Sequence, residues 1–149
     1  MTNPKPNGKV PAMNTYTMPR TLVNRIMRHA QQSPEAEVCG LVGGRDGQAC
    51  TVYPIDNVAD EPDHLFTMAA PAQIAAMRQM REQDEALYAI YHSHPHAPAE
   101  PSLRDVEEAA YPDALYLIIS LNTKGVLELR AYQLHDQRVS EAELIVEET

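Results

Sequence analysis

Apolar residues recur along this chain at helical spacing in two segments. In residues 19–32 the apolar positions are Leu22, Val23, Ile26, Met27 and Ala30. Spacings of three and four residues are typical of an amphipathic helix that buries one face. Residues 71–84 have a similar pattern, and there we expect Ile74, Met77 and Met80 to face inward. The sequence therefore predicts two long helices that pack against a core.

Between and after these helices, short apolar runs bounded by glycine, proline and asparagine predict strands. We expect strands at residues 38–42, 50–55, 87–94, 115–121 and 125–134, and an edge strand at residues 139–146. Residues 115–121 are apolar at nearly every position, which is typical of a central strand. A short helix is predicted to begin at Ser102 and end near Pro112. This order predicts one α/β domain, with helices layered on the faces of a single sheet.

The length and the charge of the chain exclude several classes of protein. With 149 residues, the chain is long enough for one domain with a core. Its formal charge of −9, from 21 acidic and 12 basic residues, argues against a nucleic acid or an anionic membrane as partner. No apolar run approaches the roughly 18 residues of a membrane span. Cys39 and Cys50 lack the Cys-x-x-Cys spacing of a thiolate zinc site.

The first residues differ in composition from the rest. Residues 1–12 are polar and contain three prolines, and we interpret them as a disordered leader ahead of a domain at residues 13–149. They contain no hydrophobic segment of a secretory signal. We therefore expect a cytoplasmic protein.

The strongest chemical signal is the pair His92 and His94. Side chains in a strand alternate between faces, so both imidazoles project from the same face. Asp105 follows eleven residues after His94, behind a loop that contains three prolines and is therefore stiff. Two imidazoles and a carboxylate are three of the ligands of a tetrahedral zinc ion, and a catalytic zinc keeps its fourth position for an acidified water. The spacing predicts a hydrolase with one Zn²⁺ per chain.

Two residues of this region also match a purely structural pattern. A serine at a helix N-cap, followed three residues later by an acidic residue, is typical of a capping box, as Ser102 and Asp105 are. For Ser102 this interpretation is compatible with a role in the site. For Asp105 the two interpretations compete, because we expect a zinc-bound carboxylate not to be free to cap. We expect His96, in the proline-rich loop, to be exposed, and its role as a further ligand stays open.

A carboxylate near a metal-bound water accepts its proton and passes it to the leaving amine. Glu37 is the candidate for this role, although taken alone it is typical of a solvated residue after a helix. The period of a strand places Glu37, Cys39 and Leu41 on one face. Cys39 is more typical of a small core residue than of a nucleophile.

Together these residues resemble the signature of the JAMM (MPN+) metalloproteases. That signature is an upstream glutamate, then His-(Ser/Thr)-His-Pro, with the spacing His-x-His-x7-Ser-x2-Asp. In this chain its positions are occupied by Glu37, His92, Ser93, His94, Pro95, Ser102 and Asp105. The similarity extends from about residue 16 to about residue 134.

The resemblance implies a deaminase-like α/β/α sandwich with a mixed central sheet. It also implies that His92, His94 and Asp105 ligate zinc. Glu37 would then be the general acid/base that acts on the zinc-bound water. Ser102 would donate a hydrogen bond to the oxyanion.

The family cleaves peptide or isopeptide bonds after the C-terminal Gly-Gly of ubiquitin-like proteins. The compact length resembles its stand-alone prokaryotic members, some of which act on small β-grasp sulfur carriers. The resemblance therefore implies such a carrier or ubiquitin-like protein as substrate, with its extended tail added to a sheet edge. Two alternatives stay open: a metallopeptidase for cell-wall or phage-tail peptides, and a non-catalytic MPN interaction module with a structural metal. The sequence also leaves a homodimer open.

Overall fold

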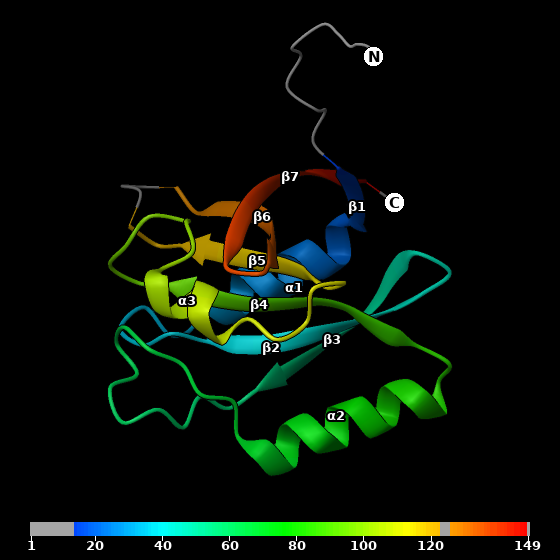
Figure 1. Cartoon of the computed structure of the whole chain (residues 1–149), viewed down its shortest axis with the longest axis horizontal. Coiled ribbons are helices and arrows are strands. Elements are labelled where there is room, and N and C mark those ends of the chain that lie inside the picture. The colour runs from blue at the N-terminus through cyan, green and yellow to red at the C-terminus, as the bar shows by residue number, and fades with distance from the viewer. Residues whose placement is uncertain (1–13, 123–125, 149) are drawn as a thin grey trace, which may run out of the picture.

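A computed structural model of the chain describes residues 14–122 and 126–148, which form a seven-stranded mixed sheet with three helices (Figure 1). The sheet order is β1-β7-β6-β5-β4-β2-β3. The strands are β1 (Thr15–Pro19), β2 (Cys39–Arg45), β3 (Gln48–Ile55), β4 (Ala86–His94), β5 (Leu115–Ser120), β6 (Glu128–His135) and β7 (Arg138–Glu147). The pairs β4–β5 and β1–β7 are parallel, and the other neighbours are antiparallel.

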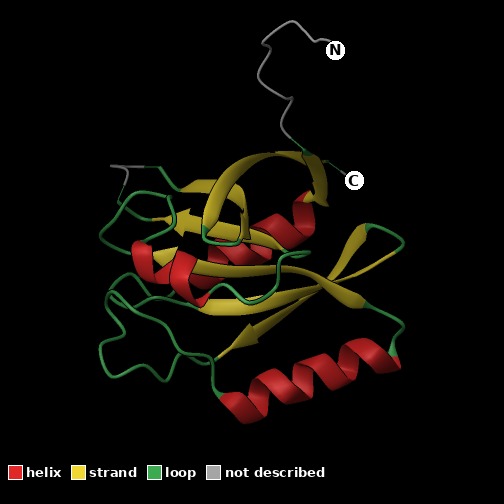
Figure 2. Cartoon of the chain, in the orientation of Figure 1, coloured by secondary structure: helices red, strands yellow, loops and turns green. Residues whose placement is uncertain are grey.

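Helices cover both faces of this sheet (Figure 2). The helices are α1 (Arg20–Gln31), α2 (Ala70–Glu82) and α3 (Leu103–Glu108). The buried face of α1 packs on one side of the sheet, in a core that includes Tyr91 and Leu117. On the other side, Ala76 and Met80 of α2 pack against a second core that includes Ile90 and Ile118. The predicted α/β/α sandwich with a mixed central sheet is confirmed.

The predicted central position of residues 115–121 is also confirmed, because β5 lies between β4 and β6. The predicted edge position of residues 139–146 is wrong. β7 pairs with β6 on one side and with β1 on the other, so β1 takes the sheet edge. The sequence analysis missed β1, a five-residue strand whose partner lies at the opposite end of the chain. A local sequence pattern does not predict such a pairing, because the pairing depends on where β7 lies in the sheet.

Two details of the helical and strand patterns differ from expectation. Ile74 was predicted to face the core, but it is 58% exposed. Helix α2 instead packs closely through Ala76 and Met80, four residues apart on one face. The strand predicted from residue 125 begins at Glu128.

Parts of three predictions lie outside the described residues. The predicted leader at residues 1–12 is one, and the start of the strand predicted from residue 125 is another. The domain limits of 13–149 therefore stay a prediction. Within the described part of the chain, no helix is both long enough and apolar enough to cross a membrane.

The candidate site lies where the chain passes from β4 through α3 to β5. Because β4 and β5 are parallel, the chain leaves the end of β4 at His94 and returns by way of α3. In open α/β sheets, ligand sites commonly lie just beyond the carboxyl ends of such strands. Here that end carries the two histidines, and α3 lies across it.

Candidate functional site

The two histidines lie side by side at the end of β4. His92 and His94 are buried, with 2% and 4% of their surfaces exposed. Their Nε2 atoms lie 3.1 Å apart. Alternation along β4 places them on the same face as Ile90, whereas Tyr91 and Ser93 point toward α1. The predicted shared face of the two imidazoles is confirmed.

Asp105 and these two imidazoles together place three atoms that could bind a metal ion in a triangle. Its Oδ2 lies 3.1 Å from His92 Nε2 and 3.3 Å from His94 Nε2. Donors bound to a tetrahedral zinc at roughly 2.0–2.1 Å are about 3.3–3.4 Å from one another. The three atoms are therefore spaced like one face of a zinc tetrahedron, and two imidazoles with a carboxylate are a donor set that zinc accepts.

The expected competition between capping and ligation at Asp105 does not occur in the structure. Asp105 Oδ2, the atom that faces both imidazoles, also accepts a hydrogen bond from Ser102 N at 2.8 Å. In return, Ser102 Oγ accepts one from Asp105 N at 3.0 Å, which completes the capping box of α3. A carboxylate oxygen has two lone pairs, so capping and facing the imidazoles are geometrically compatible. The cap itself orients the carboxylate.

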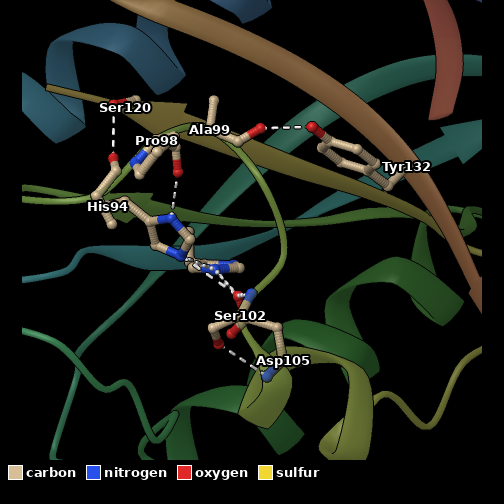
Figure 3. A network of polar contacts seen from close by, with 9 residues as sticks. His94, Pro98, Ala99, Ser102, Asp105, Ser120 and Tyr132 are labelled. Carbon is tan, nitrogen blue, oxygen red and sulfur yellow. Dashed lines mark hydrogen bonds and ion pairs between the residues drawn. The ribbon is translucent and has the colours of Figure 1, made fainter. Parts of the chain in front are cut away.

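The proline-rich loop between His94 and Ser102 is held by side chains from two other strands (Figure 3). Ser120 Oγ of β5 donates to Ala97 O at 2.7 Å, and the Tyr132 hydroxyl of β6 donates to Ala99 O. Within the loop, Pro98 O accepts a 2.8 Å hydrogen bond from the His94 ring at Nδ1. The carbonyl oxygen can only accept, so Nδ1 carries a proton, and in the neutral imidazole Nε2 then has the lone pair that a metal ion would accept. Sequence analysis anticipated a stiff loop but missed both of these anchors.

His92 is held by stacking. Its ring lies 4.5 Å from the ring of Phe66, with an interplanar angle of 26°. Phe66 comes from the segment between β3 and α2, which the sequence analysis did not connect with the site. Among the described residues, His92 Nδ1 is the one buried side-chain nitrogen or oxygen without a hydrogen-bond partner.

Burial and hydrogen bonds shift the pKa values of these groups in different directions. Burial lowers the pKa of His92 and favours the neutral imidazole. Burial also opposes ionisation of His94 and Asp105, but hydrogen bonds outweigh it, from Asp105 and Pro98 O for His94 and from both histidines for Asp105. The pKa of Asp105 is therefore well below its usual range, and the pKa of His94 is raised. Asp105 is consequently a carboxylate at neutral pH.

Glu37 approaches the same two imidazoles from the segment that precedes β2. It is only 6% exposed, so the interpretation as a solvated residue is wrong. It lies two residues before β2 rather than inside a strand. One of its carboxylate oxygens is within 4.8 Å of ligand nitrogens of both His92 and His94. Burial, opposed in part by His94, raises the pKa of Glu37 to about 7.

Two other candidates lie apart from this cluster. His96 is exposed, its Nε2 is 3.9 Å from Glu35 Oε1, and it does not belong to the group of Glu37, His92 and His94 whose ligand atoms lie within 4.8 Å of one another. Cys39 is fully buried and its thiol donates to Ile55 O at 3.4 Å. Burial raises the pKa of Cys39 to about 12, which makes the thiolate scarce at neutral pH. The prediction of Cys39 as a core residue is confirmed.

A cavity of about 360 Å³ opens beside His92 and Asp105. One wall comes from residues 64–68, and the opposite wall comes from α3 and the residues that follow it. Its floor includes the apolar side chains of Leu41 and Ile90. Arg104 and Glu108 add charge to the α3 wall. The arrangement suits a segment with apolar and polar parts that passes next to the cluster.

Residues 19–135 match the family described as prokaryotic homologs of the JAB domain. The chain belongs to this family. The match spans the strands β2 to β6, the three helices and every residue of the cluster, so the resemblance to the JAMM (MPN+) proteins is confirmed at the level of the JAB/MPN domain.

Named relatives and a solved structure agree with this membership of the prokaryotic JAB family. The CysO-cysteine peptidase of Mycobacterium tuberculosis is 34% identical over 122 residues, which cover 80% of this chain and 83% of that protein. The desampylase of Haloferax volcanii is 34% identical over 102 residues, covering 64% and 73% of the two chains. A solution structure of a Desulfitobacterium hafniense protein has a TM-score of 0.79 and 34% identity, and covers 90% and 94%. Relatives of this JAB domain thus include proteins named as a peptidase and as a desampylase.

Proposed function

We propose that this JAB-family protein is a zinc-dependent peptidase or isopeptidase that cleaves after the C-terminal Gly-Gly of a small sulfur-carrier or ubiquitin-like protein. The observation that carries the proposal is the triangle of His92 Nε2, His94 Nε2 and Asp105 Oδ2, with sides of 3.1, 3.1 and 3.3 Å. The relatives named CysO-cysteine peptidase and desampylase support the substrate class.

In this proposal His92, His94 and Asp105 hold one zinc ion. When bound there, zinc supplies Lewis acidity toward a carbonyl oxygen and lowers the pKa of water. The chain contributes the orientation of its ligands. The hydrogen bond to Pro98 O sets the tautomer of His94, and the capping box holds the Asp105 carboxylate. Such supporting bonds to metal ligands typically matter about tenfold or more for affinity.

Glu37 is the group that transfers the proton. The attacking water forms a bond to the scissile carbonyl carbon and gives its proton to the Glu37 carboxylate. When the carbon–nitrogen bond breaks, Glu37 returns that proton to the leaving amine, so charge and protons balance. In the metal-free chain burial raises the pKa of Glu37 to about 7, so this buried carboxyl can both accept and release a proton. The Ser102 hydroxyl has a hydrogen to donate to the carbonyl oxygen as negative charge develops.

The cavity beside His92 gives the carrier tail a place to bind. A Gly-Gly end has no side chains, so it passes closely between residues 64–68 and α3. The preceding residues of the tail then contact the apolar floor at Leu41 and Ile90. Addition of the tail to a sheet edge stays a prediction.

The test is intact-mass detection of cleavage of a β-grasp carrier that has an extension after Gly-Gly. The zinc-loaded protein is compared with chelator-treated protein and with two variants. Glu37→Gln keeps the shape of the side chain but cannot accept the proton. Glu35→Gln is the matched control, because Glu35 is exposed and lies only two residues away.

We expect the wild type and Glu35→Gln to release the extension, and the chelator to stop release. Glu37→Gln should retain one zinc per chain and lose activity by a factor of about 10² to 10⁴. Full activity of Glu37→Gln would overturn the role of Glu37. Zinc-loaded wild type that leaves the carrier intact would overturn the proposed substrate, and cell-wall peptides would be tested next.

A further inference from the structure

Asn57 is a polar residue that the sequence analysis did not single out, and its side chain uses every hydrogen bond that an amide can make. Its Nδ2 donates to Glu37 O at 3.0 Å and to Leu65 O at 2.9 Å. Its Oδ1 accepts from Ala59 N and from Thr67 N, both at 3.0 Å. An asparagine amide has two donor hydrogens and two acceptor lone pairs, so all four are used.

These bonds organise the segment between β3 and α2, residues 56–69. Val58 N donates to Thr67 O at 2.8 Å, and Ala69 N donates to Asp56 O at 3.0 Å. Asn57 and Met68 also pair as an isolated antiparallel bridge. The two ends of the segment are therefore joined, and the Asn57 side chain spans the space between them.

The same segment holds the backbone of Glu37 from two sides. Glu37 N donates to Pro62 O at 2.7 Å, and Glu37 O accepts from Asn57 Nδ2. Residues 64–68 of the segment form a wall of the cavity, and Phe66 stacks on His92. One loop thus contacts the proposed proton-transfer group, a proposed metal ligand and the proposed path of the substrate.

We propose that Asn57 is a positioning residue that couples the place of the Glu37 carboxylate to the order of the 56–69 segment. This inference rests on the proposed function, in that Glu37 is the proton-transfer group. Asn57 does not itself line the cavity, and its side chain contacts Glu37 through the backbone carbonyl oxygen. The coupling means that contact of a substrate with residues 64–68 also steadies Glu37.

The physical reason is that Glu37 lies outside any strand or helix. A residue in a strand has its backbone held by neighbouring strands, whereas Glu37 precedes β2 and depends on other partners. Displacing a catalytic group by about 1 Å can cost about 10²-fold in rate. Within the described part of the chain, only two hydrogen bonds from this loop hold the backbone of Glu37. Because they are so few, the loss of one should have a measurable effect on the reaction rate.

The variant that tests this is Asn57→Asp. It keeps the size of the side chain and its acceptors for Ala59 N and Thr67 N, but loses both donors and sets a carboxylate against two carbonyl oxygens. The matched control is Thr51→Val, which removes a 2.8 Å hydrogen bond to the buried Glu85 in another part of the sheet. For both variants we measure the zinc content, the free energy of unfolding, and the kcat and KM for cleavage of the extended carrier.

We expect folded, zinc-loaded Asn57→Asp to lose about 10- to 100-fold in kcat, with a smaller change in KM. Thr51→Val should lose stability and keep the kcat of the wild type. A folded Asn57→Asp with the wild-type kcat would overturn the positioning role.

Amide hydrogen exchange gives a second readout that needs no substrate. In the wild type, the amides of Glu37, Ala59 and Thr67 should exchange with a common opening free energy, because the Asn57 network joins them. In Asn57→Asp, protection of all three should fall together. Independent exchange of Glu37 in the wild type would overturn the coupling, even if Asn57→Asp fails to fold. If the wild type leaves the carrier intact, the proposed function is wrong. The exchange data alone then show whether Glu37 is coupled to the 56–69 segment.

Discussion

Ser93, which lies between the two histidines, holds both backbone groups of Val38. Its hydroxyl accepts a 2.9 Å hydrogen bond from Val38 N, and its own N–H donates to Val38 O at 3.0 Å. The register pairs of β2 and β4 end at Cys39 and His92, so this contact extends the pairing by one residue toward Glu37. The strand that carries the imidazoles therefore also fixes the residue next to the proposed proton-transfer group.

Replacing Ser93 by alanine should destabilise the fold and reduce activity. The change leaves the Val38 N–H without its partner in a buried position, which costs about 1–3 kcal/mol. Denaturant unfolding measures this loss, and kcat on the carrier measures the displacement of Glu37. Ser140→Ala is the control, because Ser140 is exposed on β7. Unchanged unfolding and kcat in Ser93→Ala would contradict the role of this hydroxyl.

The raised pKa of Glu37 predicts a pH dependence of stability in chelator-treated protein. Burial raises this pKa from 4.5 to about 7, so the folded state favours the protonated acid. The stabilisation is complete below pH 4.5 and is lost as the pH rises toward 7, which amounts to up to about 3 kcal/mol. Glu37→Gln lacks this titration.

The measurement is the difference in unfolding free energy between the metal-free wild type and metal-free Glu37→Gln. The wild type should become less stable relative to the variant as the pH is raised from 4.5 to 7. A difference that stays constant over this range would show that the carboxyl has an ordinary pKa.

Removing the Tyr132 hydroxyl should weaken the proposed metal site without changing any of its proposed ligands. In Tyr132→Phe the hydrogen bond to Ala99 O is lost, and the loop that includes Pro98 and ends at Ser102 is less firmly held. We expect zinc affinity to fall by up to about tenfold and stability by about 1 kcal/mol. Tyr88→Phe is the control, since the Tyr88 hydroxyl donates to Thr17 O far along the chain from the cluster. Equal zinc affinity for both variants, measured by competition with a chromogenic chelator, would refute this support.

A side chain at Gly40 should destabilise the fold, because Tyr91 occupies the space. A Cβ on Gly40 would meet the Tyr91 ring at 2.4–2.5 Å. The ring is fully buried, and its hydroxyl is held by His29 Nδ1 at 2.7 Å. Gly40→Ala should therefore cost about 1–3 kcal/mol of unfolding free energy.

A double-mutant cycle with Tyr91→Leu gives the check on this clash. Leucine is smaller at the contact, so Gly40→Ala should cost less in the Tyr91→Leu background than in the wild type. Additive losses in the double variant would show that the ring is not the obstacle.

Local patterns were enough to predict much of this molecule. The apolar spacing of residues 19–32 predicted a helix that buries Leu22 and Ile26, and both are buried. It failed for Ile74, because the spacing shows that a helix is amphipathic but not which of its turns meets the sheet. The run at residues 115–121 predicted a central strand, but the place of β7 depended on a strand at the far end of the chain.

The sequence by itself was enough to single out His92, His94 and Asp105 as the proposed metal ligands. Strand periodicity puts His92 and His94 on one face, and a cap of four residues joins Ser102 to Asp105, because both relations lie within a few residues and follow from backbone geometry. Only the tertiary structure decided what surrounds these atoms. Glu37 reaches the imidazoles, and Asn57 reaches Glu37, across gaps of 20 to 57 residues. Such contacts depend on strand order and chain crossings, for which no short-range pattern exists.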